Sequence, residues 1–208
     1  MGIPVLLLGE SGSGKSTSLR NFSPDEVGIL NVAGKPLPFR KQMKVINEAG
    51  YKEILSTLSR HTLKRYVIDD AQYLLCFEMF NRVRETGYQK FTDIAVSYYT
   101  MLQTIIKKTP ADCIVYILQH TELDANGRLK AKTIGKMLDE KLTIEGLFSI
   151  VLLAEVDESG YHFRTNGEPP IKSPMEMFSE TVIDNDLKAV DDTIRAYYNL
   201  NTVKENVK

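Results

Sequence analysis

Eight residues near the start of the chain, Gly9 to Ser16, have the spacing GxxxxGK[ST]. Glycines at these positions let the backbone curl around an anion, so that several N–H groups point at phosphate oxygens. In such a loop the lysine reaches the β- and γ-phosphates and the last hydroxyl binds Mg²⁺. We therefore expect a nucleoside triphosphate site that takes ATP with Mg²⁺. The predicted binding residues are Gly9, Glu10, Ser11, Gly12, Ser13, Gly14, Lys15, Ser16 and Thr17, with Lys15 also catalytic and Ser16 also a metal ligand.

The context of this loop favours phosphate binding over a chance turn rich in glycine and serine. Ile3–Leu8 is a continuous apolar run, which is typical of a buried parallel strand. The segment Lys15–Phe22 has the composition of a helix start. A strand, a loop and a helix in this order are what the phosphate-binding mechanism requires.

Two adjacent acids, Asp69 and Asp70, follow another apolar run, Tyr66–Ile68. An acid at the end of such a strand orients the water shell of Mg²⁺ in phosphate-loop enzymes, and Asp69 is our candidate for that role. Asp70 is the candidate catalytic base that polarises an attacking water. The alternative is that the two carboxylates cap a helix beginning near Ala71.

Gln119 and His120 close a further strand, Ile114–Leu118. Ligands bind at the carboxyl ends of parallel strands, so either side chain is a candidate catalytic sensor of the γ-phosphate. Val27–Val32 intervenes between the loop strand and the Asp69 strand, so we expect these two strands not to be sheet neighbours and a strand that ends in a polar sensor to lie between them. The alternative is a solvated strand end, with His120 as a structural histidine.

Apolar periodicity predicts strands and helices that alternate along the chain, which indicates an α/β fold. We expect a mostly parallel central sheet flanked by helices, with a C-terminal β-hairpin and a terminal helix. One domain spans residues 1–200, and residues 201–208 are expected to be a frayed tail. Further predicted strands are Val27–Val32, Arg65–Ile68, Phe148–Val156 and Tyr161–Arg164, and predicted helices are Ala49–Arg60, Ala71–Lys108 with a break near Gly87, and Leu187–Tyr198.

The composition argues against several classes of protein. The 208 residues carry a net charge of −1, so the total charge does not demand a polyanionic partner. Cys76 and Cys113 lie outside any CxxC pattern, which argues against a disulfide framework or a zinc site. No run approaches the ~18 apolar residues of a membrane span, and no secretory signal is recognised. We expect a cytoplasmic protein without a membrane partner.

A basic segment follows the turn at Asn126-Gly127. It has two physically reasonable uses: contact with a nucleic-acid backbone, or donation of a cation to the γ-phosphate in the same chain or a neighbouring one. The third possibility is a solvated loop, and the pattern does not choose among these. The residues concerned are Arg128, Lys130, Lys132, Lys136 and Lys141.

Several stretches together resemble one family, the small phage-encoded RecA-like P-loop ATPases, some of which are AAA-family ATPases or ATP-dependent single-strand annealing proteins. The stretches are the phosphate loop, Asn31–Arg40, Val67–Asp70, Gln119-His120 and Ile183–Val190. The resemblance implies a RecA-like core and ATP hydrolysis coupled to single-stranded DNA in recombination, annealing or replication. It also implies a homo-oligomer, a phage single-strand-binding protein as partner, and the host cytoplasm.

The chain departs from this family at one position. RecA carries its catalytic glutamate after the second strand, where Asn31–Lys35 contains no acid. Asp70 follows the other arrangement, in which the catalytic acid adjoins the metal-orienting one. Lys132 and Lys136 are candidates for lysines that act on a neighbouring subunit, although no motif fixes them.

Three other functions remain compatible with a phosphate loop. A small-molecule or nucleotide kinase would use the basic segment as a lid, but no acceptor motif is evident. A GTPase would need an NKxD motif, which the sequence lacks. A nucleotide-binding switch protein with little hydrolysis fits a chain whose catalytic base is uncertain.

Overall fold

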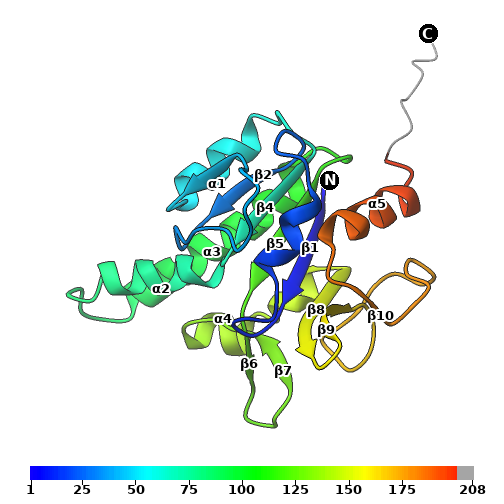
Figure 1. The fold of residues 1–208 in the computed structure, drawn as a ribbon. Coiled ribbons are helices and arrows are strands. Elements are labelled where there is room, and N and C mark those ends of the chain that lie inside the picture. Colours follow the sequence, from blue (N-terminus) through cyan, green and yellow to red (C-terminus); the bar gives the residue numbers. More distant parts are fainter. Residues whose placement is uncertain (201–208) are drawn as a thin grey trace.

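The computed structural model describes residues 1–200, and eight of its strands form one sheet (Figure 1). A two-stranded ribbon lies apart from that sheet. The predicted tail, residues 201–208, lies outside the described residues. The strands of the large sheet are β1 (Ile3–Leu8), β2 (Gly28–Asn31), β3 (Val45–Asn47), β4 (Arg65–Asp69), β5 (Ile114–Gln119), β8 (Ile150–Asp157), β9 (Gly160–Arg164) and β10 (Val182–Asp184), and those of the ribbon are β6 (Thr121–Leu123) and β7 (Leu129–Ala131).

The order of the strands is β10-β9-β8-β1-β5-β4-β2-β3. The strands from β8 to β3 in this order are parallel, whereas β9 and β10 are antiparallel to their neighbours. The mostly parallel sheet and the terminal β8–β9 hairpin are therefore as predicted. The expectation that a strand ending in a polar residue separates the loop strand from the Asp69 strand is also confirmed, and that strand is β5.

Helices cover both faces of the sheet, which confirms the α/β fold. The α-helices are α1 (Tyr51–Ser59), α2 (Gln72–Asn81), α3 (Gln89–Lys108), α4 (Lys136–Lys141) and α5 (Leu187–Tyr197), and the 3-10 helices are η1 (Ser16–Asn21) and η2 (Ile144–Leu147). The predicted long helix from residue 71 to residue 108 is broken into α2 and α3, with Gly87 at φ 89° in the connection.

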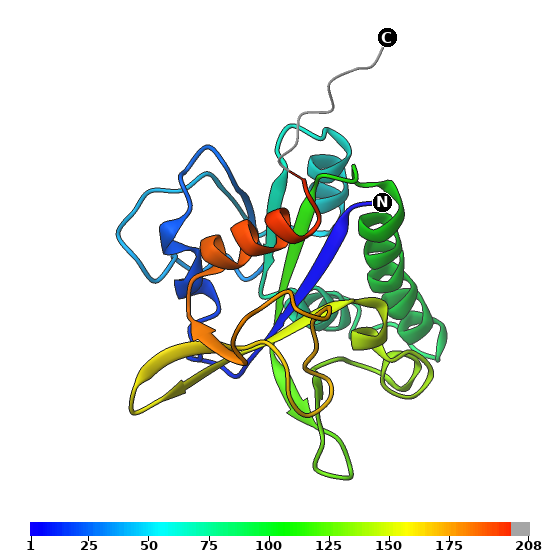
Figure 2. The same ribbon diagram turned by 90° about the vertical axis from the view of Figure 1, so that its right-hand side faces the viewer.

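Alternation along the strands creates two separate cores. Leu6, Leu8 and Ile68 point to the face covered by α1, α2 and α3. Val5 and Leu7 point to the opposite face, which η1 and α5 cover. Figure 2 shows α5 and η1 on one side of the sheet and α3 on the other. Both faces of the central strands are thus apolar, which explains their continuous hydrophobic runs.

Three-residue strands are the main elements that the pattern did not predict. β3, β6, β7 and β10 each contain three residues, which is too short for a recognisable alternation. β6 and β7 pair across the predicted Asn126-Gly127 turn, so part of the basic segment is a hairpin.

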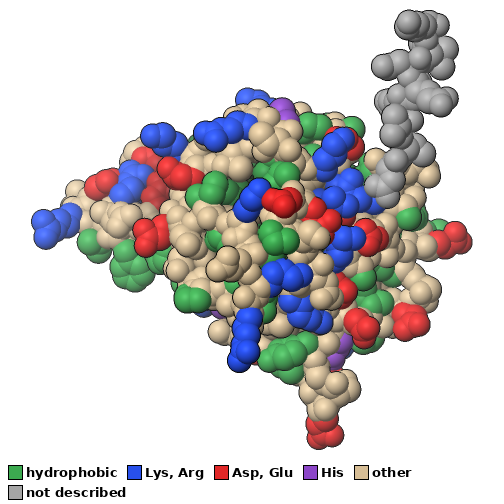
Figure 3. All heavy atoms as spheres, turned by 45° about the horizontal axis from the view of Figure 1, so that its top comes forward, with side chains coloured by type: hydrophobic (Ala, Val, Ile, Leu, Met, Phe, Trp, Pro, Cys, Tyr) green, Lys and Arg blue, Asp and Glu red, His purple; other side chains and the backbone are tan. Residues whose placement is uncertain are grey.

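Charged side chains of both signs are interspersed on the face drawn in Figure 3, as the net charge of −1 suggests. Within residues 1–200, no helix combines the length and the apolar character that crossing a bilayer requires.

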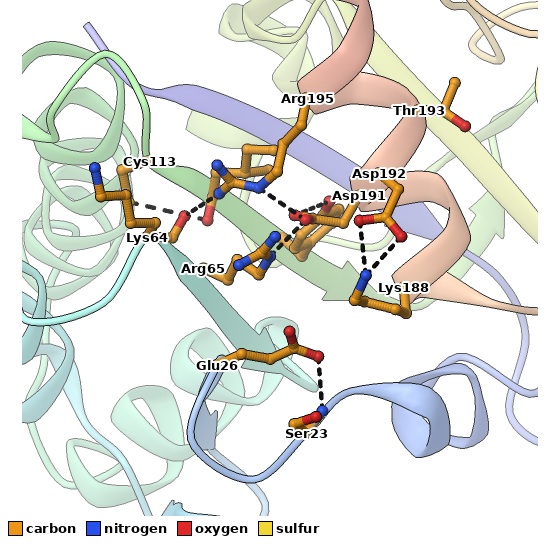
Figure 4. Close-up of polar contacts among 12 residues, drawn as sticks. Ser23, Glu26, Lys64, Arg65, Cys113, Lys188, Asp191, Asp192, Thr193 and Arg195 are labelled. Carbon is orange, nitrogen blue, oxygen red and sulfur yellow. Dashed lines mark hydrogen bonds and ion pairs between the residues drawn. The ribbon is translucent and has the colours of Figure 1, made fainter. Parts of the chain in front are cut away.

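Helix α5 is attached to the sheet by a buried ionic cluster (Figure 4). Asp191 is fully buried and accepts hydrogen bonds from Arg195 Nε at 2.9 Å and Arg65 Nε at 2.5 Å. Tyr116 on β5 donates its hydroxyl to the other carboxylate oxygen at 3.0 Å. Arg195 also donates to the carbonyl oxygen of Lys64 at 2.8 Å. A buried carboxylate is tolerated here because each of its oxygens has a partner.

Replacing Asp191 by alanine is expected to lower the free energy of unfolding by about 3–5 kcal/mol, because Arg195 then stays buried without its anion. Urea denaturation followed by circular dichroism measures the change. Asp192→Ala is the matched control on the same helix, since Asp192 is exposed and pairs with Lys188 at the surface. That control is expected to change stability by less than about 0.5 kcal/mol. Equal effects of the two substitutions would contradict the ionic cluster as the attachment of α5.

Candidate functional site

The loop between β1 and η1 has a backbone shape that only glycine adopts easily. Gly12 and Gly14 have φ values of 85° and 86°, in the left-handed region. A Cβ atom on Gly14 would also lie 2.7 Å from Cδ1 of Tyr161, and one on Gly9 would lie 2.7 Å from the carbonyl oxygen of Ala154. The glycines of the motif are therefore required by this fold as well as by the approach of an anion.

Lys15 lies inside the curve of this loop. Its Nζ donates hydrogen bonds to the carbonyl oxygens of Gly9 and Glu10, both at 2.7 Å. The residue is 5% exposed, and burial lowers the pKa of the ammonium to about 8. A buried ammonium of this kind gains from an anionic partner, and phosphate oxygens would supply one.

Asp69 meets the phosphate loop across the intervening strand β5. Ser16 Oγ donates a hydrogen bond to Asp69 Oδ1 at 2.9 Å, although the two residues lie 53 positions apart. Asp69 ends β4, and it is 4% exposed. The structure thus brings the two predicted metal ligands together.

A hydroxyl and a carboxylate oxygen fit Mg²⁺, which prefers hard oxygen donors. Residues 1–200 contain no group of three or more His, Cys, Asp or Glu side chains that would hold a metal ion. Ser16 and Asp69 would therefore share the ion with phosphate oxygens and water, as is usual for Mg²⁺ at nucleotide sites.

Asp70 is held by a lysine and a histidine that follow two different strands. Lys35, in the loop after β2, places Nζ 2.5 Å from Asp70 Oδ2. His120, directly after β5, places Nε2 3.3 Å from Asp70 Oδ1. Asp70 itself has φ 61°, a left-handed conformation that is uncommon for a residue with a side chain. Such backbone conformations cluster at functional sites.

These groups line one pocket with a volume of about 340 Å³. That volume is within the range of ~300–1,000 Å³ that is usual for ligand sites. The lining residues are Ser11, Gly12, Gly14, Lys15, Ser16, Thr17, Lys35, Pro36, Pro38, Asp69, Asp70, His120 and Tyr161.

Gln119 is the predicted catalytic residue that the structure does not bring into this pocket. It is fully buried, and its amide is engaged at both ends. Oε1 accepts a hydrogen bond from Tyr98 at 2.5 Å, and Nε2 donates to the carbonyl oxygen of Lys132 at 2.7 Å. Gln119 thereby connects α3 to the residue after β7, and no contact supports a role in sensing phosphate.

One lysine of the basic segment is neutralised by acids of its own surroundings. Lys130 pairs with Glu122 at 3.0 Å and with Asp139 at 3.1 Å. Asp124 accepts hydrogen bonds from the backbone N–H of Arg128 and of Asn126. None of the five basic residues lines the phosphate pocket. Arg128, Lys132, Lys136 and Lys141 are exposed, so the function of the basic segment stays a prediction.

Comparison with known proteins adds little to this geometry. No protein-family model matches the chain. No curated protein sequence matches it either.

Two solved structures share part of the fold. One is the P4 protein of bacteriophage phi6 in complex with ADP, at 20% identity and a TM-score of 0.42. The other is the P4 protein of bacteriophage phi13, at 15% identity and a TM-score of 0.43. Each comparison covers 80% of this chain and 58% of the P4 chain, so this chain spans less than two thirds of those proteins. A likeness at this level carries no argument about function.

Four lining residues were not predicted as site residues: Lys35, Pro36, Pro38 and Tyr161. Lys35 belongs to the Asn31–Arg40 stretch, to which no site role was assigned, and strand order brings it beside Asp70. Tyr161 arrives on the β8–β9 hairpin, from far along the chain, and packs on Gly14. Asn185 also reaches the loop, where its Nδ2 donates to the carbonyl oxygen of Gly14 at 3.3 Å. No spacing rule in the sequence connects these residues with the loop.

The two adjacent carboxylates differ in their electrostatic environment. Burial, and then the neighbouring charge of Asp70, raises the pKa of Asp69 to about 6. Burial also acts to raise the pKa of Asp70, but hydrogen bonds from His120 and Lys35 outweigh it and hold that pKa at about 2. At neutral pH both groups are ionised, and Asp69 is the one whose charge is poorly compensated by protein groups. A metal ion would compensate it.

Asp69→Asn is expected to raise the free energy of unfolding at pH 7 by about 1–3 kcal/mol, measured by urea denaturation in metal-free buffer. Because the folded-state pKa of Asp69 is raised, its carboxylate destabilises the fold at pH 7. That destabilisation declines as the pH falls below about 6 and is lost near the ordinary carboxyl pKa of 3.8, so the advantage of the variant should shrink over this range.

Asp70→Asn is the matched control with the opposite sign. The lowered pKa of Asp70 means that its carboxylate stabilises the fold above its ordinary pKa, and that this stabilisation is lost as the pH falls toward about 2. The variant should therefore be less stable than the natural protein at pH 7. Destabilisation by both substitutions to the same extent would refute the electrostatic difference between the two carboxylates.

Proposed function

We propose that this chain binds and hydrolyses a nucleoside triphosphate, ATP with Mg²⁺, and couples the reaction to single-stranded DNA. The observation that carries the nucleotide part is the meeting of Lys15, Ser16, Asp69 and Asp70 around one pocket at the carboxyl edge of the sheet. A phosphate loop alone would indicate binding. A buried acid pair beside it supplies the groups that hydrolysis also requires.

Each residue of the pocket has a separate role in this proposal. The backbone of the loop and the Lys15 ammonium bind the phosphates, and Ser16 and Asp69 hold the metal ion. Mg²⁺ supplies charge neutralisation at the transferring phosphoryl group. Asp70 accepts a hydrogen bond from the attacking water and orients it, and His120 fixes the position of that carboxylate.

Tyr161 is the candidate contact for the nucleoside part. Its ring packs against Gly14 and lines the pocket beside the phosphate loop, and the residue is 50% exposed. An exposed aromatic face of this kind stacks on a nucleobase. We propose that the base or ribose lies against this ring.

The DNA part rests on the resemblance to small phage-encoded RecA-like ATPases of the single-strand annealing type. The same resemblance is the basis for a homo-oligomer, a single-strand-binding protein as partner, and the host cytoplasm as location. The basic hairpin at residues 121–131 gives this part little support, because its central lysine is paired with acids.

A kinase is the second candidate, and one structural observation favours it. A groove of about 990 Å³ lies beside β9, β10 and α5, and Tyr161 lines both this groove and the phosphate pocket. Its lining includes His162, Arg164 and several acids, so a polar acceptor would fit it. Transfer of phosphate to a molecule other than water would establish this function instead.

The first test is the release of phosphate from ATP by the purified protein, with and without single-stranded DNA. We expect turnover that DNA stimulates, and a loss of at least about a hundredfold in Lys15→Ala, because the buried cation contacts the transferring phosphates. Lys44→Ala is the matched control, since Lys44 is exposed and pairs with the exposed Asp25.

The outcomes of this test separate the two parts of the proposal. Turnover without stimulation would contradict the DNA coupling alone. Turnover that Lys15→Ala leaves intact would show that the activity does not arise at the phosphate loop.

The second test measures nucleotide affinity in Tyr161→Ala and Tyr161→Phe by calorimetry. Loss of the ring is expected to weaken ATP and ADP binding equally, by about 1–3 kcal/mol, because stacking acts on the base and not on the phosphates. Tyr161→Phe keeps the ring and should bind nearly as the natural protein does. Unchanged affinity in Tyr161→Ala would show that the base lies elsewhere.

A further inference from the structure

The loop after β2 places a lysine at the end of the phosphate pocket that carries Asp70. Asn31, the last residue of β2, pairs with Asp69 in the parallel register, so the two strands end side by side. The side chain of Asn31 then donates to the carbonyl oxygen of Lys35 at 2.7 Å and closes the turn. Gly34 provides a φ of 67° within that turn. The register of the sheet and the buried side-chain amide of Asn31 thus fix the position of Lys35.

The Lys35 ammonium is held at its tip but is open to water along most of its side chain. Nζ lies 2.5 Å from Asp70 Oδ2 and 5.8 Å from the centre of the Tyr73 ring. The side chain is 61% exposed, whereas that of Asp70 is 4% exposed. An ion pair with so exposed a lysine side chain contributes little net free energy, so this contact is suited to replacement by another anion.

A triphosphate would supply the competing anion. Among the described residues that line the pocket, the lysines are Lys15 and Lys35. Lys15 lies in the phosphate loop, and Lys35 lies at the end that carries Asp70. A terminal phosphate approaching this carboxylate would be repelled unless a cation lay between the two. Lys35 is the side chain positioned to do so.

We propose that Lys35 recognises the terminal phosphate of the nucleotide, exchanging its contact with Asp70 for that phosphate. The inference rests on the proposed nucleotide site and names the group that distinguishes a triphosphate from a diphosphate there. When the ammonium moves, one oxygen of Asp70 becomes free to accept a hydrogen bond from water. The loop between β2 and β3 then reports which nucleotide is bound.

The test compares the affinities of ADP and of a non-hydrolysable ATP analogue by calorimetry in the natural protein, Lys35→Ala and Lys35→Arg. Lys35→Ala should weaken the analogue roughly 10- to 100-fold, as expected for one hydrogen bond between charged groups, and ADP by less than about threefold. Lys35→Arg should retain most of the preference for the analogue. Lys44→Ala, in the same connection but outside the pocket, should change neither affinity.

A second set of variants tests the exchange itself. Asp70→Asn removes the competing anion, so it should strengthen binding of the analogue relative to ADP when Lys35 is present. In a Lys35→Ala background the same substitution should have a clearly smaller effect on that ratio. A merely structural lysine would give the same ratio in both backgrounds, and that result would overturn the inference.

The two proposals fail in different ways. If the natural protein binds nucleotide, Lys15→Ala does not, and Lys35→Ala leaves the preference for the analogue unchanged, the nucleotide site stands and the role of Lys35 is refuted. If the natural protein binds neither ADP nor the analogue, both proposals are refuted together.

Discussion

Two ionised carboxylates on consecutive, nearly buried residues impose the main constraint on this molecule. Asp69 and Asp70 repel one another, and burial penalises both charges. The fold resolves the conflict by giving Asp70 a lysine and a histidine as neighbours, whereas Asp69 accepts a hydrogen bond from the neutral hydroxyl of Ser16. The two carboxylates therefore differ in what they can bind. Asp70 already has its partners within the protein, whereas Asp69 is available to a cation from solution.

Parallel register is what makes this arrangement possible. β1, β5, β4 and β2 end at one edge of the sheet, so each strand contributes a polar group to the same pocket. The strands themselves are apolar on both faces, and the two cores on either side hold their register. An imperfectly compensated carboxylate is tolerable in such a frame because the stability lies elsewhere, in those cores and in the buried cluster around Asp191.

The sequence predicted the features that depend on residues close together in the chain. It missed those that depend on how distant segments pack against one another. The phosphate loop, the acids after β4 and the terminal hairpin follow from spacing and periodicity over a few residues. A strand that ends in a polar residue was also expected between β1 and β4, because Val27–Val32 intervenes between them along the chain, and β5 occupies that position. Lys35 and Tyr161 were missed because only strand order and hairpin packing bring them to the pocket. Gln119 was a candidate for the surface of the pocket. Successive side chains along β5 point to opposite faces of the sheet, so that of Gln119 faces away from the pocket.

The contact of the β8–β9 hairpin and Asn185 with Gly14 has a consequence for how the protein is made. The central strand β1 pairs with β5 and β8, which leave the ribosome more than a hundred residues after it. An apolar segment emerging so early has no partner during most of translation and is exposed to aggregation or to chaperones. The pocket itself stays incomplete until Tyr161 and Asn185 have been synthesised and have packed against the loop. On the proposed function, the nucleotide site is therefore complete only after β9 and Asn185 have been synthesised.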